Sequence, residues 1–145
     1  MRVIVSRVKK ASVKVDDKVV GKCGKGLLIL VGFTAGDGDE EIEYLAKKCV
    51  NLRIFDDEKG VMNKSVLDIN GSILSISQFT LYGDASKGNR PSYIKALGGE
   101  ESTVLYDKFN DKLREYTKVE TGIFGADMQI EEAKDGPVTI IIDSK

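Results

Sequence analysis

The feature that most narrowly limits the fold of this chain is a run of five consecutive apolar residues, Leu27–Val31. Gly24 and Gly26 stand just before the run, and a short apolar run flanked by glycines is typical of a strand buried on both faces. Such a strand needs other structure packed against each face. The run therefore predicts a layered domain with this strand inside a sheet.

Two segments carry apolar residues at the spacing of an amphipathic α-helix, which buries one stripe and exposes the rest. The first covers about 39–52 and follows a loop that supplies N-cap residues, and the second covers about 100–116. The expected stripes consist of Ile42, Leu45, Ala46, Cys49 and Leu52 in the first helix and Val104, Leu105, Phe109, Leu113 and Tyr116 in the second.

Strand-like segments account for most of the remaining chain, and we expect about seven strands. Residues 2–15 form either a strand pair or one bent strand, and a turn at Asp16-Asp17 leads into a strand at 18–22. The other expected strands are 27–31, 53–55, 71–81, 126–133 and 137–143. Because most strands follow one another directly, mostly antiparallel pairing is expected. We predict a single α/β domain over residues 1–145, layered β/β/α, with two main helices.

The absence of histidine limits the chemistry that is open to this chain. A Ser-His-Asp triad, a Cys-His dyad and a histidine-ligated metal are all excluded. Cys23 and Cys49 lie too far apart in the sequence for a metal motif, and Cys49 falls on the apolar stripe of the first helix. We therefore expect a buried structural thiol at Cys49, with no metal and no cofactor.

Charge and hydropathy restrict the partners and the cellular location. The net charge is -1, so contact with nucleic acid must be local, and charge alone favours no such partner. The first residues resemble a strand rather than a signal peptide, and no apolar run approaches the roughly 20 residues of a membrane helix. Together with reduced thiols, this predicts a cytoplasmic protein without a membrane partner.

Two polar segments are candidates for function. Ser77-Gln78-Phe79-Thr80 ends an apolar strand, where polar groups often face a pocket because the strand holds them rigidly. Lys87 and Arg90 lie in a long polar loop, where Arg can bind phosphate in a bidentate manner. Taken alone, an ordinary strand edge and a solvated surface loop explain the two segments better.

Two further segments contain small or rigid residues. Phe124 and Met128 follow Gly122 and could contact a base, although core packing is the commoner role. Gly136-Pro137 precedes the last strand, where a plain hairpin turn is the simpler interpretation. No segment is a strong motif by itself.

Taken together and in this order, these segments resemble the D-aminoacyl-tRNA deacylase family of the D-Tyr-tRNA deacylase type. The resemblance covers nearly the whole chain, and its most specific parts are Ser77–Leu81 and Gly136–Thr139. Lys134 departs from the pattern, because Asn is frequent there in the family. The matching segments are Arg7-Val8, Ala11–Val13, Gly24–Leu28, Arg53–Phe55, Met62-Asn63, Lys87-Gly88, Arg90–Ser92, Gly122 and Phe124–Met128.

The resemblance implies hydrolysis of the ester that joins a D-amino acid to tRNA, as a chirality proofreading step in translation, with glycyl-tRNA also accepted. It implies a homodimer in which a cis Gly136–Pro137 bond reaches into the partner's pocket, where its carbonyls capture the substrate's α-amino group. The backbone amides around Gln78 and Phe79 would stabilise the oxyanion. Thr80 would act either as a nucleophile or by positioning water, and an activating base for it is hard to name without histidine.

The resemblance also implies that Lys87 and Arg90 contact tRNA phosphates and that Phe124 and Met128 lie near the terminal adenosine. The main alternative is an editing deacylase that removes a mischarged L-amino acid. A non-catalytic RNA- or DNA-binding dimer is a second alternative, although the charge weakens it. A purely structural interaction module is a third, and it predicts no concave pocket near Ser77–Thr80.

Overall fold

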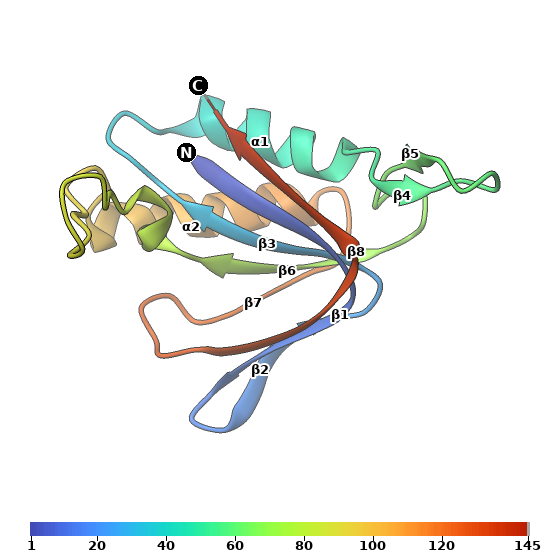
Figure 1. Ribbon diagram of the computed structural model, residues 1–145, viewed down its shortest axis with the longest axis horizontal. Coiled ribbons are helices and arrows are strands. Elements are labelled where there is room, and N and C mark those ends of the chain that lie inside the picture. The colour runs from blue at the N-terminus through green and yellow to red at the C-terminus, as the bar shows by residue number, and fades with distance from the viewer. Residues whose placement is uncertain (145) are drawn as a thin grey trace.

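The computed structural model describes residues 1–144, and its sheet is built around one long bent strand, β1 (Arg2–Val15) (Figure 1). The first half of β1 pairs antiparallel with β3 (Gly26–Gly32), and the second half pairs antiparallel with β2 (Lys18–Cys23). Along its other edge, β1 pairs antiparallel with β8 (Gln129–Asp143). The single bent strand is therefore the correct alternative for residues 2–15.

The hairpin between β1 and β2 closes at the expected turn. Asp16 and Asp17 have φ angles of 50° and 63°, in the left-handed region. Asp tolerates this region better than most residues, and two consecutive positive φ angles match the right-handed twist of the flanking strands. The two aspartates thus fix the register of the first hairpin.

Two strands extend the sheet in parallel fashion. β6 (Ser72–Ser77) pairs parallel with β3, and β7 (Val119–Thr121) pairs parallel with β6. Parallel neighbours need a crossover, and the helices α1 (Asp39–Asn51) and α2 (Gly99–Arg114) lie within the two crossovers. The sheet order is β2-β1-β3-β6-β7, with β8 on β1, so a mixed but mostly antiparallel sheet is confirmed.

The bend of β1 creates the layers. One core lies between the helices and the first half of the sheet and includes Leu27 and Ile29. A second core lies between that sheet and the hairpin of β1 and β2 folded beneath it, and includes Leu28, Leu74 and Ile76. The adjacent Leu27 and Leu28 are both buried, on opposite faces. The β/β/α layers and the doubly buried strand are thereby confirmed (Figure 1).

Several boundaries differ from the sequence prediction. The strand expected over 71–81 ends at Ser77, and the 3-10 turn η1 (Phe79–Tyr82) follows it. The strand expected at 53–55 is β4 (Phe55–Asp56), which pairs with β5 (Met62–Lys64). β5 and β7 were not predicted, because three residues are too few to show an apolar period. Of the second expected helical stripe, Val104 and Tyr116 are exposed.

The two strands expected on either side of Gly136–Pro137 form one continuous strand, β8. Its pairing with β1 shifts register between Ser6 and Val8, whose partners lie at Thr139 and Lys134. Pro137 can sit inside a strand here because a bulge leaves residues out of the ladder and because β8 pairs only with β1 among the described residues.

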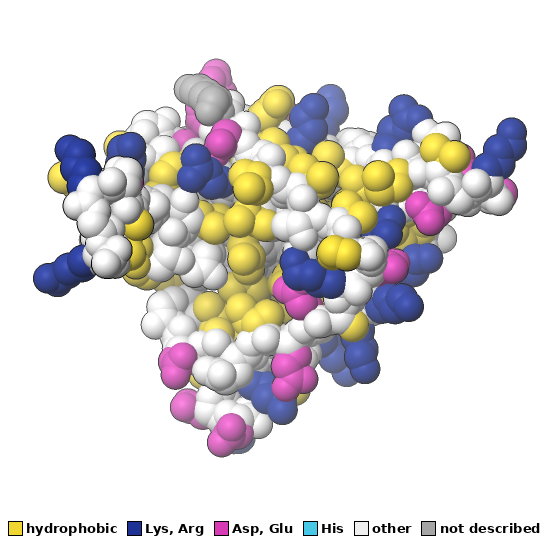
Figure 2. All heavy atoms as spheres, in the orientation of Figure 1, with side chains coloured by type: hydrophobic (Ala, Val, Ile, Leu, Met, Phe, Trp, Pro, Cys, Tyr) yellow, Lys and Arg dark blue, Asp and Glu magenta, His cyan; other side chains and the backbone are white. Residues whose placement is uncertain are grey.

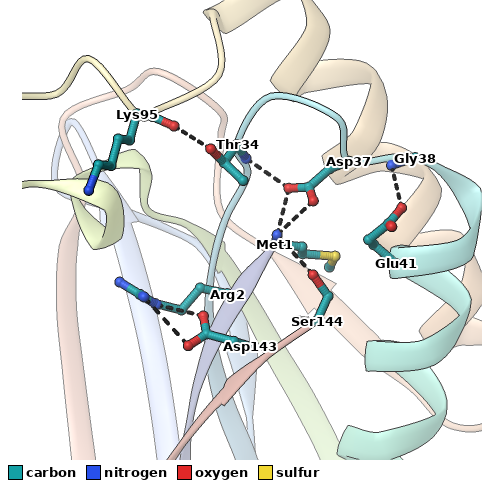
Figure 3. Close-up of polar contacts among 9 residues, drawn as sticks. All are labelled: Met1, Arg2, Thr34, Asp37, Gly38, Glu41, Lys95, Asp143 and Ser144. Atoms are coloured by element: carbon teal, nitrogen blue, oxygen red, sulfur yellow. Dashed lines mark hydrogen bonds and ion pairs between the residues drawn. The ribbon is translucent and has the colours of Figure 1, made fainter.

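Both ends of the described chain meet beside the first turn of α1 (Figure 3). The Met1 amino group donates to Asp37 Oδ1 at 2.7 Å and to Ser144 Oγ at 3.1 Å. Asp37 also accepts the backbone N–H of Thr34 at 2.7 Å. The Met1 and Asp37 side chains are only 0% and 6% exposed, so this ion pair is buried and ties β1 to the loop before α1.

Both cysteines are free and buried. Burial raises the pKa of Cys49 to about 12 and that of Cys23 to about 11, which suits inert thiols. The structural role expected for Cys49 is confirmed. Among residues 1–144 no helix is long and apolar enough to cross a membrane.

Candidate active site

A cavity of about 280 Å³ opens where β6 ends beside the connection from β7 to β8. It unites two segments that the sequence analysis selected separately, because Ser77, Gln78 and Phe79 form one wall, and Phe124 and Met128 form the other. The remaining lining residues are Ile76, Gly125, Ala126 and Ile130. The cavity therefore combines apolar walls with a polar edge, as small-molecule sites commonly do.

The polar edge exists because β6 ends abruptly at the cavity. The Gln78 N–H donates to Val31 O at 2.7 Å, which is the last bond of the ladder between β6 and β3. The chain then turns into η1, and the Leu81 N–H donates to Gln78 O at 3.2 Å. A Cβ at Gly32 would lie 2.8 Å from Gln78 O, so only glycine admits this turn beside β3.

The geometry of this turn determines which backbone N–H groups are free to donate a hydrogen bond to a ligand. The Gln78 amide is engaged by Val31 and cannot also bind an oxyanion without losing that bond. The amides of Phe79 and Thr80 are the first of a helical turn, and such amides have no partner within the turn. Phe79 and Thr80 are therefore better placed than Gln78 to donate to a developing negative charge.

The side chains along the polar edge provide no strong base. The Gln78 side-chain amide donates to the hydroxyl of Thr80, and both groups lie near the surface. A carboxamide that donates its N–H cannot remove the proton of that hydroxyl. Among residues 1–144 no cluster of His, Cys, Asp or Glu could hold a metal ion.

A buried tyrosine supports the apolar wall. The Tyr106 ring lies 5.9 Å from the Phe124 ring, and its hydroxyl donates to Ser75 O in β6 at 2.7 Å. Burial raises the pKa of Tyr106, so the hydroxyl keeps its proton and remains a donor. Met128 packs close to the backbone on this wall, since a Cβ at Gly122 would lie 2.5 Å from its sulfur.

Gly136 and Pro137 lie outside this cavity in the same chain. Their peptide bond is cis, as the resemblance implied, and both residues are exposed. β8 itself reaches the cavity at Ile130, but Gly136 lies six residues farther along this strand. At about 3.3 Å per residue, this amounts to roughly 20 Å. The structure thus does not bring these residues to Ser77–Thr80 within one chain.

Arg7 holds the bulge that contains Gly136. Its Nε donates to Asp135 O at 2.9 Å, and its Nη1 donates to Ile54 O at 2.7 Å. Arg7 is only 8% exposed, and a Cβ at Gly136 would lie 3.0 Å from Arg7 Nη2. Gly136 also has a φ of 128°, which favours glycine. The guanidinium therefore fixes the backbone just before Pro137.

Comparison with known proteins identifies the family. The family model described as D-Tyr-tRNA(Tyr) deacylase matches residues 4–143. The chain belongs to this deacylase family. A D-aminoacyl-tRNA deacylase of Clostridium acetobutylicum is 57% identical over 146 residues, covering 100% of this chain and 98% of the relative. A D-aminoacyl-tRNA deacylase of Clostridium botulinum (strain Langeland) is 55% identical with the same coverage.

Two solved structures have folds similar to that of this chain. A structure named c-Myc DNA Unwinding Element Binding Protein has a TM-score of 0.95 and 38% identity, and covers 100% of this chain and 99% of its own. A probable eukaryotic D-amino acid tRNA deacylase has a TM-score of 0.84 and 20% identity, with 97% of each chain covered. At that identity the second structure supports the fold alone.

The remaining predicted residues of this deacylase-family chain lie apart from the cavity. Lys87 and Arg90 are exposed in the loop after η1, where Asp84 and Ser92 form a two-bond bridge at its base. Arg7 belongs to a segment that resembles the family, but its role becomes visible only in the structure. The signal was present, because Arg7 follows Val3 and Val5 at the strand period and so faces inward.

Proposed function

We propose that this chain hydrolyses the ester bond of D-aminoacyl-tRNA, releasing a free D-amino acid and tRNA. The observation that carries the proposal is the cavity with Ser77 and Gln78 in its wall and η1 beside it, in a chain of the deacylase family. An ester is already activated relative to an amide, so a strong nucleophile is not required. The site needs to hold a water molecule and to stabilise the oxyanion.

Residues that line the cavity, together with Thr80, which follows the lining residue Phe79 in η1, would divide these tasks. The backbone amides of Phe79 and Thr80 would donate to the oxyanion, and one such donor is typically worth about 10²–10³ in rate. The Thr80 hydroxyl, oriented by Gln78, would position the water. A nucleophilic Thr80 is disfavoured because its neighbour is a donor rather than a base. Ser77 would line the floor beside the ester.

The proposed site becomes complete in a homodimer. Gly136 and Pro137 do not line the cavity of their own chain, and in the proposed dimer a second copy would bring them to it. There their carbonyls would accept hydrogen bonds from the α-amino group and leave no room for an L side chain. The D side chain would point outward, so several D-amino acids and glycine would be accepted.

Positively charged side chains in the loop after η1 would help to bind the tRNA. Lys87 and Arg90 would meet phosphates, while Phe124 and Met128 would contact the terminal adenosine. No cofactor is required by this mechanism. A chirality check on charged tRNA would place the protein with the translation machinery in the cytoplasm.

The direct test measures release of tyrosine from D-Tyr-tRNA and L-Tyr-tRNA side by side, with limiting protein and no added metal. We expect rapid loss of the D ester with the L ester spared. Equal loss of both esters would retain the ester chemistry but contradict the chirality mechanism. Loss of the L ester alone would favour an editing deacylase for mischarged L-amino acids. Survival of both esters would contradict the proposal.

A second candidate function is binding to DNA. It is favoured by the name of the 38% identical relative, c-Myc DNA Unwinding Element Binding Protein. The net charge of -1 is unfavourable, since affinity for duplex DNA depends largely on phosphate contacts. Duplex DNA that bound more tightly than tRNA at equal salt would support this candidate.

A further inference from the structure

Beside the cavity, the segment 79–97 exposes a cluster of aromatic and aliphatic side chains. The rings of Phe79 and Tyr93 meet edge to face, with centroids 5.1 Å apart. Phe79 is 54% exposed, Tyr93 is 41% exposed, and the adjacent Ile94 is 89% exposed. Single exposed apolar residues are ordinary, but three that are neighbours in space or sequence indicate a contact surface.

The backbone holds Tyr93 in place. The bridge between Asp84 and Ser92 consists of two hydrogen bonds of 2.9 Å, and it closes the loop immediately before Tyr93. A Cβ at Gly83 would lie 3.0 Å from Tyr93 Cε1, so the ring rests directly against the Gly83 backbone. Tyr93 is therefore fixed between Gly83 and Phe79, and ordering it on binding costs little entropy.

The surroundings of this pair are basic. Segment 79–97 contains Lys87, Arg90 and Lys95 but only one acid, Asp84, in a chain whose net charge is -1. A second cavity of about 310 Å³, lined in part by Arg2, Gly83 and Lys95, adjoins the ring of Tyr93 through Gly83. The segment lies at the left end of Figure 1, and Figure 2 shows Lys and Arg side chains at that end.

We propose that Phe79, Tyr93 and Ile94 form a stacking platform for the unpaired nucleotides that precede the esterified nucleotide. Phe79 belongs to both the cavity and the aromatic pair, so an RNA strand leaving the cavity would pass over the pair. Stacking on aromatic rings is tolerant of sequence, and the nearby cations would follow the backbone phosphates. This inference rests on the proposed function, because it assumes that the cavity holds the 3′ end.

The test compares two substrates of different length, D-Tyr-tRNA and D-tyrosyl-adenosine, which lacks the preceding nucleotides. We expect Tyr93→Ala to lower kcat/KM for D-Tyr-tRNA by about tenfold, mainly through KM, and to leave D-tyrosyl-adenosine unchanged. Tyr93→Phe should retain wild-type values. Tyr116→Ala is the matched control, because Tyr116 is also 41% exposed but lies after the end of α2, outside the platform.

Three results would overturn the platform. These are an equal loss on both substrates, no loss on either, and a change of oligomeric state in sedimentation, which would make the surface a subunit contact. Binding of unacylated tRNA, measured by fluorescence anisotropy, separates the platform from the proposed function. If the wild-type chain hydrolysed no ester, a Tyr93→Ala loss of tRNA binding of about tenfold would still support the platform, and unchanged binding would overturn it.

Discussion

At the scale of single residues, Arg7 holds the backbone of the β8 bulge next to Gly136. Its two donors reach Asp135 O and Ile54 O, which lie on different segments of the chain. Arg7→Lys keeps the charge but loses the planar fork, so at least one carbonyl loses its donor. We expect the free energy of unfolding to fall by about 1–3 kcal/mol and discrimination against L-Tyr-tRNA to weaken.

Urea unfolding and the ratio of D to L hydrolysis measure these two effects separately. A variant that lost stability but kept the full D to L ratio would show that Arg7 supports the fold without fixing Gly136 and Pro137. Lys134→Ala is a suitable control, because Lys134 also links β8 to β1 through the hydroxyls of Thr139 and Ser6, but its loss leaves both carbonyls paired.

The buried ion pair at the N-terminal amine supplies a second residue-scale prediction. Asp37→Asn removes the charge that faces Met1 in a site where both side chains are nearly inaccessible (Figure 3). Removing one partner of a buried pair typically costs about 3–5 kcal/mol. Asp143→Asn is the control, since the Arg2–Asp143 pair is 36% and 39% exposed and should be worth about 0–1 kcal/mol. Equal shifts of the urea midpoint for the two variants would contradict the prediction.

The two thiols give a third prediction, based on pKa. With a pKa of about 12, Cys49 carries thiolate in about one molecule in 10⁴ at pH 8, and burial further restricts access. Alkylation by iodoacetamide at pH 8 should therefore be negligible in the native protein and rapid in urea. Because the Cys49 pKa of about 12 lies well above pH 8, the thiolate fraction, and with it the reactivity, should continue to increase as the pH rises above 8. Fast native labelling at pH 8 would contradict the buried position.

At the scale of the secondary structure elements, α2 supports the cavity through Tyr106. Tyr106→Phe removes the hydrogen bond to Ser75 O but keeps the ring against Phe124. We expect a loss of about 1 kcal/mol in stability with little change in kcat/KM. Tyr106→Leu removes the ring as well, so the Phe124 wall should shift and kcat/KM should fall. Equal activity of the two variants would show that Tyr106 does not position this wall.

The elements that the sequence predicted correctly are those with a local signal. The run Leu27–Val31 and the helix near 39–51 show their burial in their own spacing. η1 was missed because its cause lies elsewhere: Gly32 on the neighbouring strand leaves room for the Gln78 carbonyl. The same reason explains why the sequence could select Ser77–Thr80 and Phe124–Met128 but could not join them, since their contact is long-range.

At the scale of the whole molecule, the length of β8 separates two features that the proposed reaction needs together. The cavity opens beside the end of β6 and the start of β8, whereas Gly136 and Pro137 lie farther along β8 and do not line it. Each chain therefore carries both parts of the proposed site, the cavity and Gly136–Pro137, but at two separate places. A two-fold symmetric pair, in which each copy supplies both halves, satisfies this arrangement twice.

Mixing two defective chains tests this arrangement. Ala126→Trp fills the cavity, and Gly136→Ala places a Cβ 3.0 Å from Arg7 Nη2 at a φ of 128°, so each homodimer should be nearly inactive. In the mixed dimer, the intact cavity of one chain would meet the intact Gly136–Pro137 bulge of the other. Because random exchange gives half mixed dimers, each with one of two sites intact, activity should recover to about one quarter of wild type. Recovery is measured with D-Tyr-tRNA after the chains have been unfolded and refolded together. If the cavity and the Gly136–Pro137 bulge acted within a single chain, both chains of every mixed dimer would be defective and no activity would return.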